Sequence, residues 1–152
     1  MKYDFIKNVI EQFKLSYFKT NDDIEKQKIK AMLNQCLRIC DNYLYINLAS
    51  KKAIEEAQKL NINLSKMHWQ NQSKFDPTRK VFIFEHKTPI KMIIDRILLN
   101  DSDINNILES IEIAWITKEE NDILDKKGYK SNRPDPNLAY KEAGIILLPI
   151  NN

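Results

Sequence analysis

The stretch that most constrains the fold runs from Arg79 to Leu99. It holds a continuous apolar run over residues 81–84, then Thr88-Pro89, then apolar residues three and four apart. A short continuous apolar run is typical of a strand that is buried on both faces. A threonine followed by proline is a strong helix start, because the hydroxyl caps the helix and proline suits its first turn. We therefore predict a buried strand over Lys80–His86, a tight turn, and a helix that begins at Pro89.

The first sixty residues carry apolar side chains at the three- and four-residue spacing of amphipathic helices. This spacing predicts helices over residues 3–18, from about Asp22 to Leu48, and over residues 51–60, with Ser50 as the cap of the last. No proline or glycine separates the last two, so one continuous rod is an open alternative. Cys36 and Cys40 lie four residues apart on the inward side of this pattern, and we interpret them as core cysteines of a reducing compartment.

The remainder of the chain alternates apolar strand-like runs with helix start signals. Strands are predicted over 112–116 and 145–150, and a short strand around 64–69. Helices are predicted after Asp101 or Ser102, after the capping box that opens at Thr117, and after Asp135-Pro136. The expected fold class is α+β: a single domain over residues 1–152. Its helical layer spans residues 3–60 and docks on a sheet of three to four strands with intervening helices over 61–152.

Composition and charge exclude several classes of protein. The hydrophobic fraction is 43%, the charged fraction is 30% and the net charge is +3, which are values of a globular protein with a mildly basic balance. Neither of the glycine-rich phosphate-binding motifs, G-x-x-x-x-G-K and G-x-G-x-x-G, occurs in the sequence. Nucleotide binding by loops of these two kinds is therefore excluded. The chain has no apolar run of 18 residues and no signal-like apolar segment at its start, so we expect a cytoplasmic protein without a membrane partner.

The residues at the end of the predicted buried strand are the main candidates for chemistry. Side chains alternate along a strand, so Glu85 and Lys87 should point to one side and His86 to the other. With Asp76 upstream, this pattern resembles the metal-dependent nucleases of the PD-(D/E)XK class. The resemblance implies that Asp76 and Glu85 bind a divalent ion, with magnesium as the cofactor, while Lys87 steadies the attacking water and the phosphate charge.

Each of these residues also has a structural interpretation. Glu85 and Lys87 are equally compatible with an ion pair or cap at the end of a strand. His86 is a candidate general base because its pKa lies near neutral pH, and a histidine with a structural hydrogen bond is the alternative. The only other histidine, His68, gives no zinc-like spacing with the cysteines.

A second candidate segment is the loop that follows the helix after Thr117. It combines four cations and a tyrosine around Gly128, and the side chains that we expect to bind nucleic acid are Lys126, Lys127, Tyr129, Lys130 and Arg133. Lysine and arginine neutralise phosphates, and a tyrosine ring can stack on a base. The alternative is a helix C-terminus that carries lysines because the helix dipole favours them, followed by a solvated loop.

Taken together, the sequence favours a small nucleic-acid-acting protein, in its most specific form a magnesium-dependent nuclease with Glu85, His86 and Lys87 as catalytic residues. Two alternatives stay open. One is a non-enzymatic protein-binding inhibitor or regulator from a mobile element. The other is a structural subunit that oligomerises through the long helix. The sequence alone leaves open whether the chain is an enzyme, whether it prefers DNA or RNA, and its oligomeric state.

Overall fold

The structure is a computed structural model that describes residues 3–150, and these residues group into two compact units. Among these residues, a helical unit comprises 3–41 together with 90–111, and a sheet unit comprises 42–89 and 112–150. The chain thus leaves the sheet unit after its second strand and returns to it 22 residues later. The helical unit thus takes segments from both sides of residue 60.

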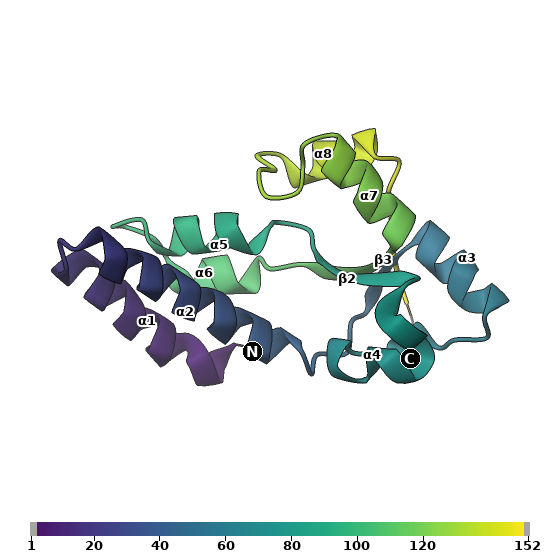
Figure 1. The fold of residues 1–152 in the computed structure, drawn as a ribbon, viewed down its shortest axis with the longest axis horizontal. Helices are drawn as coiled ribbons and strands as arrows, with labels where there is room; N and C mark the ends of the chain where they lie inside the picture. Colours follow the sequence, from purple (N-terminus) through teal and green to yellow (C-terminus); the bar gives the residue numbers. More distant parts are fainter. Residues whose placement is uncertain (1–2, 151–152) are drawn as a thin grey trace. The chain divides into compact units, whose positions relative to one another are not determined.

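The helical unit consists of α1 (Asp4–Lys19), α2 (Asp23–Asp41), α5 (Ile90–Ile97) and α6 (Ile104–Glu109). A short loop makes α1 and α2 an antiparallel pair, seen in Figure 1 as two adjacent purple and dark-blue helices. The hydroxyl of Tyr3 donates a hydrogen bond of 2.6 Å to Asp41 Oδ1, which joins the start of α1 to the end of α2. α5 packs on α2, and α6 packs on α1. The core between these helices is aliphatic, with Ile10, Leu33, Leu37, Ile93 and Ile97 buried.

The helix that was predicted to reach Leu48 ends at Asp41, so this boundary was wrong. Residues Leu48–Ser50 form strand β1, which the sequence did not reveal. A strand of three residues is too short to show an alternating pattern, and its hydrogen-bonding partners lie far along the chain, at Trp115 and Leu148. Long-range pairing therefore overrode the local helical spacing.

The sheet unit is built on four strands in the order β2-β3-β1-β4, which confirms the α+β class. Their bounds are β1 (Leu48–Ser50), β2 (Phe82–His86), β3 (Ile113–Thr117) and β4 (Leu147–Pro149). β2 pairs antiparallel with β3, and His86 faces Ile113 while Phe82 faces Thr117. β1 runs parallel to β3 and antiparallel to β4. The predicted strands at 80–86, 112–116 and 145–150 are therefore all present.

Three further helices of this unit begin where their capping residues predict. They are α3 (Lys51–Lys59) after Ser50, α7 (Lys118–Lys126) after Thr117 and α8 (Pro136–Glu142) after Asp135. Thr117 and Glu120 form the predicted capping box, in which each side chain caps the other's backbone N–H. The buried carboxylate of Glu120 also accepts a hydrogen bond of 2.6 Å from Ser50 Oγ, so one side chain ties together the starts of α3 and α7.

The segment between α3 and β2 contains helical turns, so the strand predicted around residues 64–69 was wrong. Its elements are η1 (Leu64–Lys66), η2 (Trp69–Asn71), α4 (Gln72–Phe75) and η3 (Pro77–Arg79). Side chains of this segment cap its own turns, as when His68 Nδ1 accepts from the Asn71 N–H. Among residues 3–150, no helix has the length and apolar character needed to cross a membrane.

One face of the sheet packs against α7 and α8 and forms the core that positions the candidate site. Ala114 and Ile116 of β3 meet residues of both helices there, and the buried members from the helices and the following turn are Leu124, Ala139, Tyr140, Ala143 and Ile145. Glu85 belongs to the same side of β2 as Ile83, which also packs on this core. The end of β2 therefore carries an acidic side chain to the margin of an apolar layer.

Candidate functional site

Arg133 and Glu85 form a buried ion pair where β2 ends. The guanidinium Nη1 of Arg133 lies 2.9 Å from Glu85 Oε1. The same nitrogen donates to the carbonyl oxygens of His86 and Lys87 at 3.2 and 2.9 Å. Nε and Nη2 donate to the carbonyl of Tyr129. One arginine thus holds the loop before α8 against the end of β2.

Burial perturbs the acid–base groups beside this pair. Loss of hydration raises the pKa of Glu85 above the ordinary range of a glutamate, although the charge and hydrogen bond of Arg133 oppose the shift. Burial also raises the pKa of Tyr140, and the nearby Glu85 adds to that shift. The ring of Tyr140 lies under the Arg133 guanidinium, with 5.6 Å from the guanidinium carbon to the ring centroid. Perturbed titratable groups that gather beside a crevice are typical of functional sites.

A crevice of about 470 Å³ adjoins this cluster. Polar side chains come from β2's end and from α8, and an apolar wall comes from the turn into β4; the lining residues are Lys87, Asn137, Tyr140, Lys141, Gly144, Ile145, Ile146 and Leu147. The buried hydroxyl of Tyr140 has no hydrogen-bond partner among the residues that the structure describes. A buried hydroxyl without a partner is uncommon in folded proteins.

Lys87 occupies the mouth of this crevice and does not meet Glu85 directly. Its ammonium lies 3.0 Å from Glu112 Oε1, across the β2–β3 ladder. The Lys87 side chain is 18% exposed and that of Glu112 is 50% exposed. Glu85 and Lys87 therefore have separate partners, and each partner comes from elsewhere in the chain.

The structure does not bring Asp76 to Glu85. The buried carboxylate of Asp76 accepts hydrogen bonds from the backbone N–H groups of Lys80, Val81 and Phe82 and from the amide of Gln72. It thereby caps the start of β2, whereas Glu85 lies three residues on, roughly 10 Å along a strand. Within residues 3–150, no group of three or more histidine, cysteine, aspartate or glutamate side chains is arranged to hold a metal ion. The carboxylates of Asp76 and Glu85 therefore do not fit the expected magnesium site.

His86 lies on the other side of β2 from Glu85, as the strand alternation predicts. It is buried, and its ring packs edge-on against Phe84 with 6.1 Å between the ring centroids. Phe84 in turn contacts Trp115 on β3 in the same edge-on manner. An aromatic cluster therefore surrounds the side chain that was considered as a general base.

The loop after α7 divides into exposed and buried members. The exposed ones are the lysines Lys126, Lys127 and Lys130. Tyr129 is half-buried, and its hydroxyl donates a hydrogen bond to Glu142. Arg133 is 1% exposed and is engaged as described above, so it does not contribute to the exposed surface as the sequence led us to expect. Its role is to anchor the loop.

Sequence reasoning missed Tyr140, Lys141 and Asn137. The signal available was the Asp135-Pro136 helix start, which correctly located α8. Nothing in the sequence, however, indicated that this helix lies against the end of β2. That juxtaposition depends on the Arg133 contacts and on the α8 side of the sheet core.

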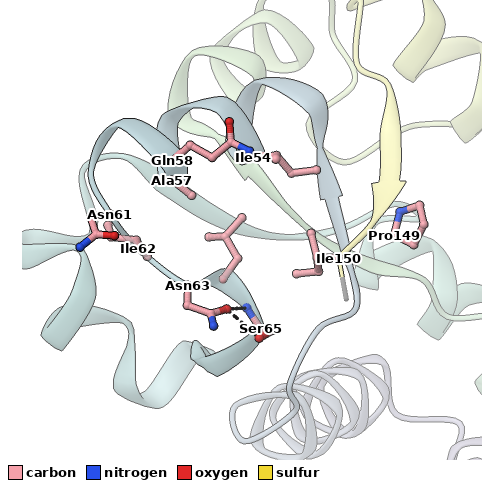
Figure 2. A pocket seen from close by; sticks show the side chains of 10 residues that line it. Ile54, Ala57, Gln58, Asn61, Ile62, Asn63, Ser65, Pro149 and Ile150 are labelled. Atoms are coloured by element: carbon pink, nitrogen blue, oxygen red, sulfur yellow. Dashed lines mark hydrogen bonds between the residues drawn. The ribbon is translucent and has the colours of Figure 1, made fainter. Parts of the chain in front are cut away.

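Further depressions lie among the described residues of the sheet unit. Figure 2 shows the residues that line one groove, between α3, the turn at residues 61–65 and the end of β4. The volume of this groove is about 580 Å³. Its lining carries no charged side chain, and Asn63 accepts hydrogen bonds from the N–H and hydroxyl of Ser65 within its own turn. Another depression, of about 420 Å³, lies at the carboxyl end of β3. The positive and negative side chains that line it are equal in number: Lys52, Lys80, Lys118, Glu55, Glu56 and Glu119. Neither presents a net positive surface.

Comparisons with protein-family models, with curated proteins and with solved structures find no match to this chain.

Proposed function

We propose that this protein binds nucleic acid at the end of its sheet where β2 finishes and the 126–133 loop begins. The observation that carries the proposal is the Arg133–Glu85 ion pair at 2.9 Å. It joins two segments 48 residues apart that were each expected, on independent grounds, to contact a polynucleotide. A basic loop and a polar strand end thus form one continuous candidate surface.

The charge at this surface supports a polyanionic ligand. Lys126, Lys127, Lys130 and Lys141 are exposed, and Lys87 lines the crevice. Two of the nearby acidic side chains are already engaged, Glu112 by Lys87 and Glu142 by the Tyr129 hydroxyl. Lysines that remain exposed are available to neutralise phosphates and to release their counterions, which is the main source of sequence-independent affinity.

The crevice adds a feature that a phosphate backbone alone would not need. Its apolar wall includes Ile145 and Leu147, and Asn137 and Lys141 of α8 also line it. A volume of about 470 Å³ is within the range of small-ligand sites and exceeds what one nucleobase requires. We therefore favour a ligand with an unpaired base near the strand end, held by lysines on either side.

The proposed activity is binding, without a hydrolytic step. A two-carboxylate magnesium mechanism needs both acids on one ion, and Asp76 and Glu85 sit at different ends of β2. Lys87 is half-buried and is paired with Glu112. The nuclease interpretation had placed this lysine beside an attacking water.

A direct test is fluorescence anisotropy of labelled oligonucleotides with the full chain. Single-stranded DNA, single-stranded RNA and duplex DNA of equal length are titrated at several salt concentrations. We expect measurable affinity that is highest for a single strand, with log K falling against log salt at a slope of about −2 to −4, the value for three to five phosphate contacts. Absence of binding at the lowest salt, or affinity that does not change with salt, would contradict the proposal.

A further inference from the structure

The α1–α2 pair of the helical unit exposes an apolar face. Phe5 and Val9 of α1 are 71% and 43% exposed. Met32 and Ile39 of α2 are 49% and 60% exposed, and Cys36 between them is half-buried. Large apolar side chains are common singly on protein surfaces, but a group of them on adjacent helices marks an interaction site.

These side chains lie on one side of the pair. On α1, Phe5 and Val9 are turned about 100° from the buried stripe of Ile6 and Ile10, and on α2 the exposed row is turned by a similar angle from Leu33 and Leu37. On each helix, the exposed row is rotated from the buried stripe by a similar angle and in the same direction about the helix axis. Because the two helices are antiparallel, this rotation places both rows on the same side of the pair. The contacts made by the opposite side of each helix are consistent with this placement. Lys14 of α1 bonds Ser102, and Lys30 of α2 bonds Asp95, so those flanks face the α5 and α6 segment.

The two rows also match in height. The Tyr3–Asp41 hydrogen bond fixes the register of the pair, because it joins the first turn of α1 to the last residue of α2. Counting inward from it, Phe5 is level with Ile39, and Val9 is level with Cys36. The face is therefore one continuous patch across the groove between the helices.

The spacing of the patch identifies what kind of surface fits it. The row on α1 continues as Phe5, Val9, Gln12 and Ser16, and the row on α2 as Ile29, Met32, Cys36 and Ile39. Both follow alternating steps of four and three, the spacing by which helices pack nearly parallel in four-helix bundles. None of these eight side chains is charged, so the patch does not select a partner of opposite charge. A second pair of helices with the same spacing and no charge is its natural complement.

We propose that two copies of the chain associate through this face, with the α1–α2 pair of one copy packed on that of the other. A two-fold axis lets a self-complementary patch bury itself, and such dimers are the commonest oligomers. The four large apolar side chains expose roughly 450 Å², if a fully exposed one presents about 200 Å². That area suits the apolar part of an interface of about 800 Å² per partner. This association is separate from the nucleic-acid surface, which belongs to the sheet unit.

The test is the mass of the full chain in solution by sedimentation equilibrium, with two charge substitutions on one helix. Ile39→Lys places a charge on the patch. Ile24→Lys is the matched control, because Ile24 is also on α2 and is 64% exposed but points to another side. We expect a reversible dimer for the native chain and for Ile24→Lys, and a dissociation constant raised by roughly 100-fold for Ile39→Lys. A native chain that stays monomeric up to about 200 µM, or equal weakening by both substitutions, would overturn the proposal.

The thiol of Cys36 gives a second readout that does not depend on a substitution. Its alkylation by iodoacetamide should slow as the concentration of the native chain rises, because the dimer covers it. Cys40 is the internal reference, since it is buried in the helical unit and burial raises its pKa to about 11. A Cys36 alkylation rate that is the same in dilute and concentrated solution would count against the dimer.

Discussion

The Arg133 guanidinium donates a 2.9 Å hydrogen bond to Glu85, and the arginine is the more deeply buried partner, with 1% of its side chain exposed against 16% for the glutamate. An arginine cannot shed its proton to escape burial, so it must be held by acceptors. Glu85 and the carbonyls of His86, Lys87 and Tyr129 supply them. Arg133 therefore joins the basic loop to the strand end, beside the packing of Tyr129 on the sheet core.

Arg133→Met should be strongly destabilising, because it leaves the Glu85 carboxylate buried without its partner and three carbonyls without their donor. We expect a loss of about 3–5 kcal/mol in the free energy of unfolding, measured by urea titration. Lys130→Met, in the same loop but exposed, should change it by no more than about 0.5 kcal/mol. Similar losses for the two variants would show that Arg133 does not anchor the loop.

Glu85 should make the stability of the fold depend on pH. Burial raises its pKa in the folded chain above that in the unfolded chain. Its contribution is therefore fully present below the unfolded pKa and is lost as the pH rises through the folded pKa. The stability of the native chain minus that of Glu85→Gln, measured by urea unfolding from about pH 4 to about pH 8, should fall with rising pH. A difference that grows with pH would mean that Arg133 outweighs burial and that the folded pKa is lowered.

Asp76→Asn tests whether this buried acid is structural. The carboxylate accepts from three successive backbone N–H groups, and an amide retains only one acceptor oxygen. We expect a loss of about 2–3 kcal/mol in the free energy of unfolding. Magnesium at millimolar concentration should leave the melting temperature of the native chain and of the variant unchanged. A magnesium-dependent rise in the native chain alone would restore the metal-site prediction for Asp76.

Much of the fold followed from local chemistry. The Thr117 capping box and Asp135-Pro136 located α7 and α8, because caps are set by neighbours a few residues away, and the helix predicted from Pro89 begins at Ile90. β2 was evident because its apolar residues form a continuous run, although Ile83, Phe84 and Glu85 are only partly buried on this edge strand. β1 was missed because its three residues are defined by pairing with β3 and β4 and carry no pattern of their own.

The candidate site was predictable only in part. Lys87 and the lysines of the 126–133 loop were located from sequence, because a strand end and a basic loop are recognisable locally. The partners of Glu85 were not, since the sequence offered Asp76 and Lys87 while the fold supplied Arg133. Arg133, which was expected to face solvent, is instead buried, where it donates to a carboxylate and to backbone carbonyls at the strand end. These contacts appear only when the strand end and the loop are brought together.

Binding of a labelled single strand by two charge-reversed variants tests the central claim most directly. Lys130→Glu/Lys141→Glu alters the proposed surface, while Lys52→Glu/Lys118→Glu alters exposed lysines at the carboxyl end of β1 and β3 and changes the net charge equally. We predict that the first variant weakens affinity by roughly 30-fold or more and the second by about threefold or less. Equal weakening by both variants, or a larger effect from the second, would contradict nucleic-acid binding at the Arg133–Glu85 end of the sheet.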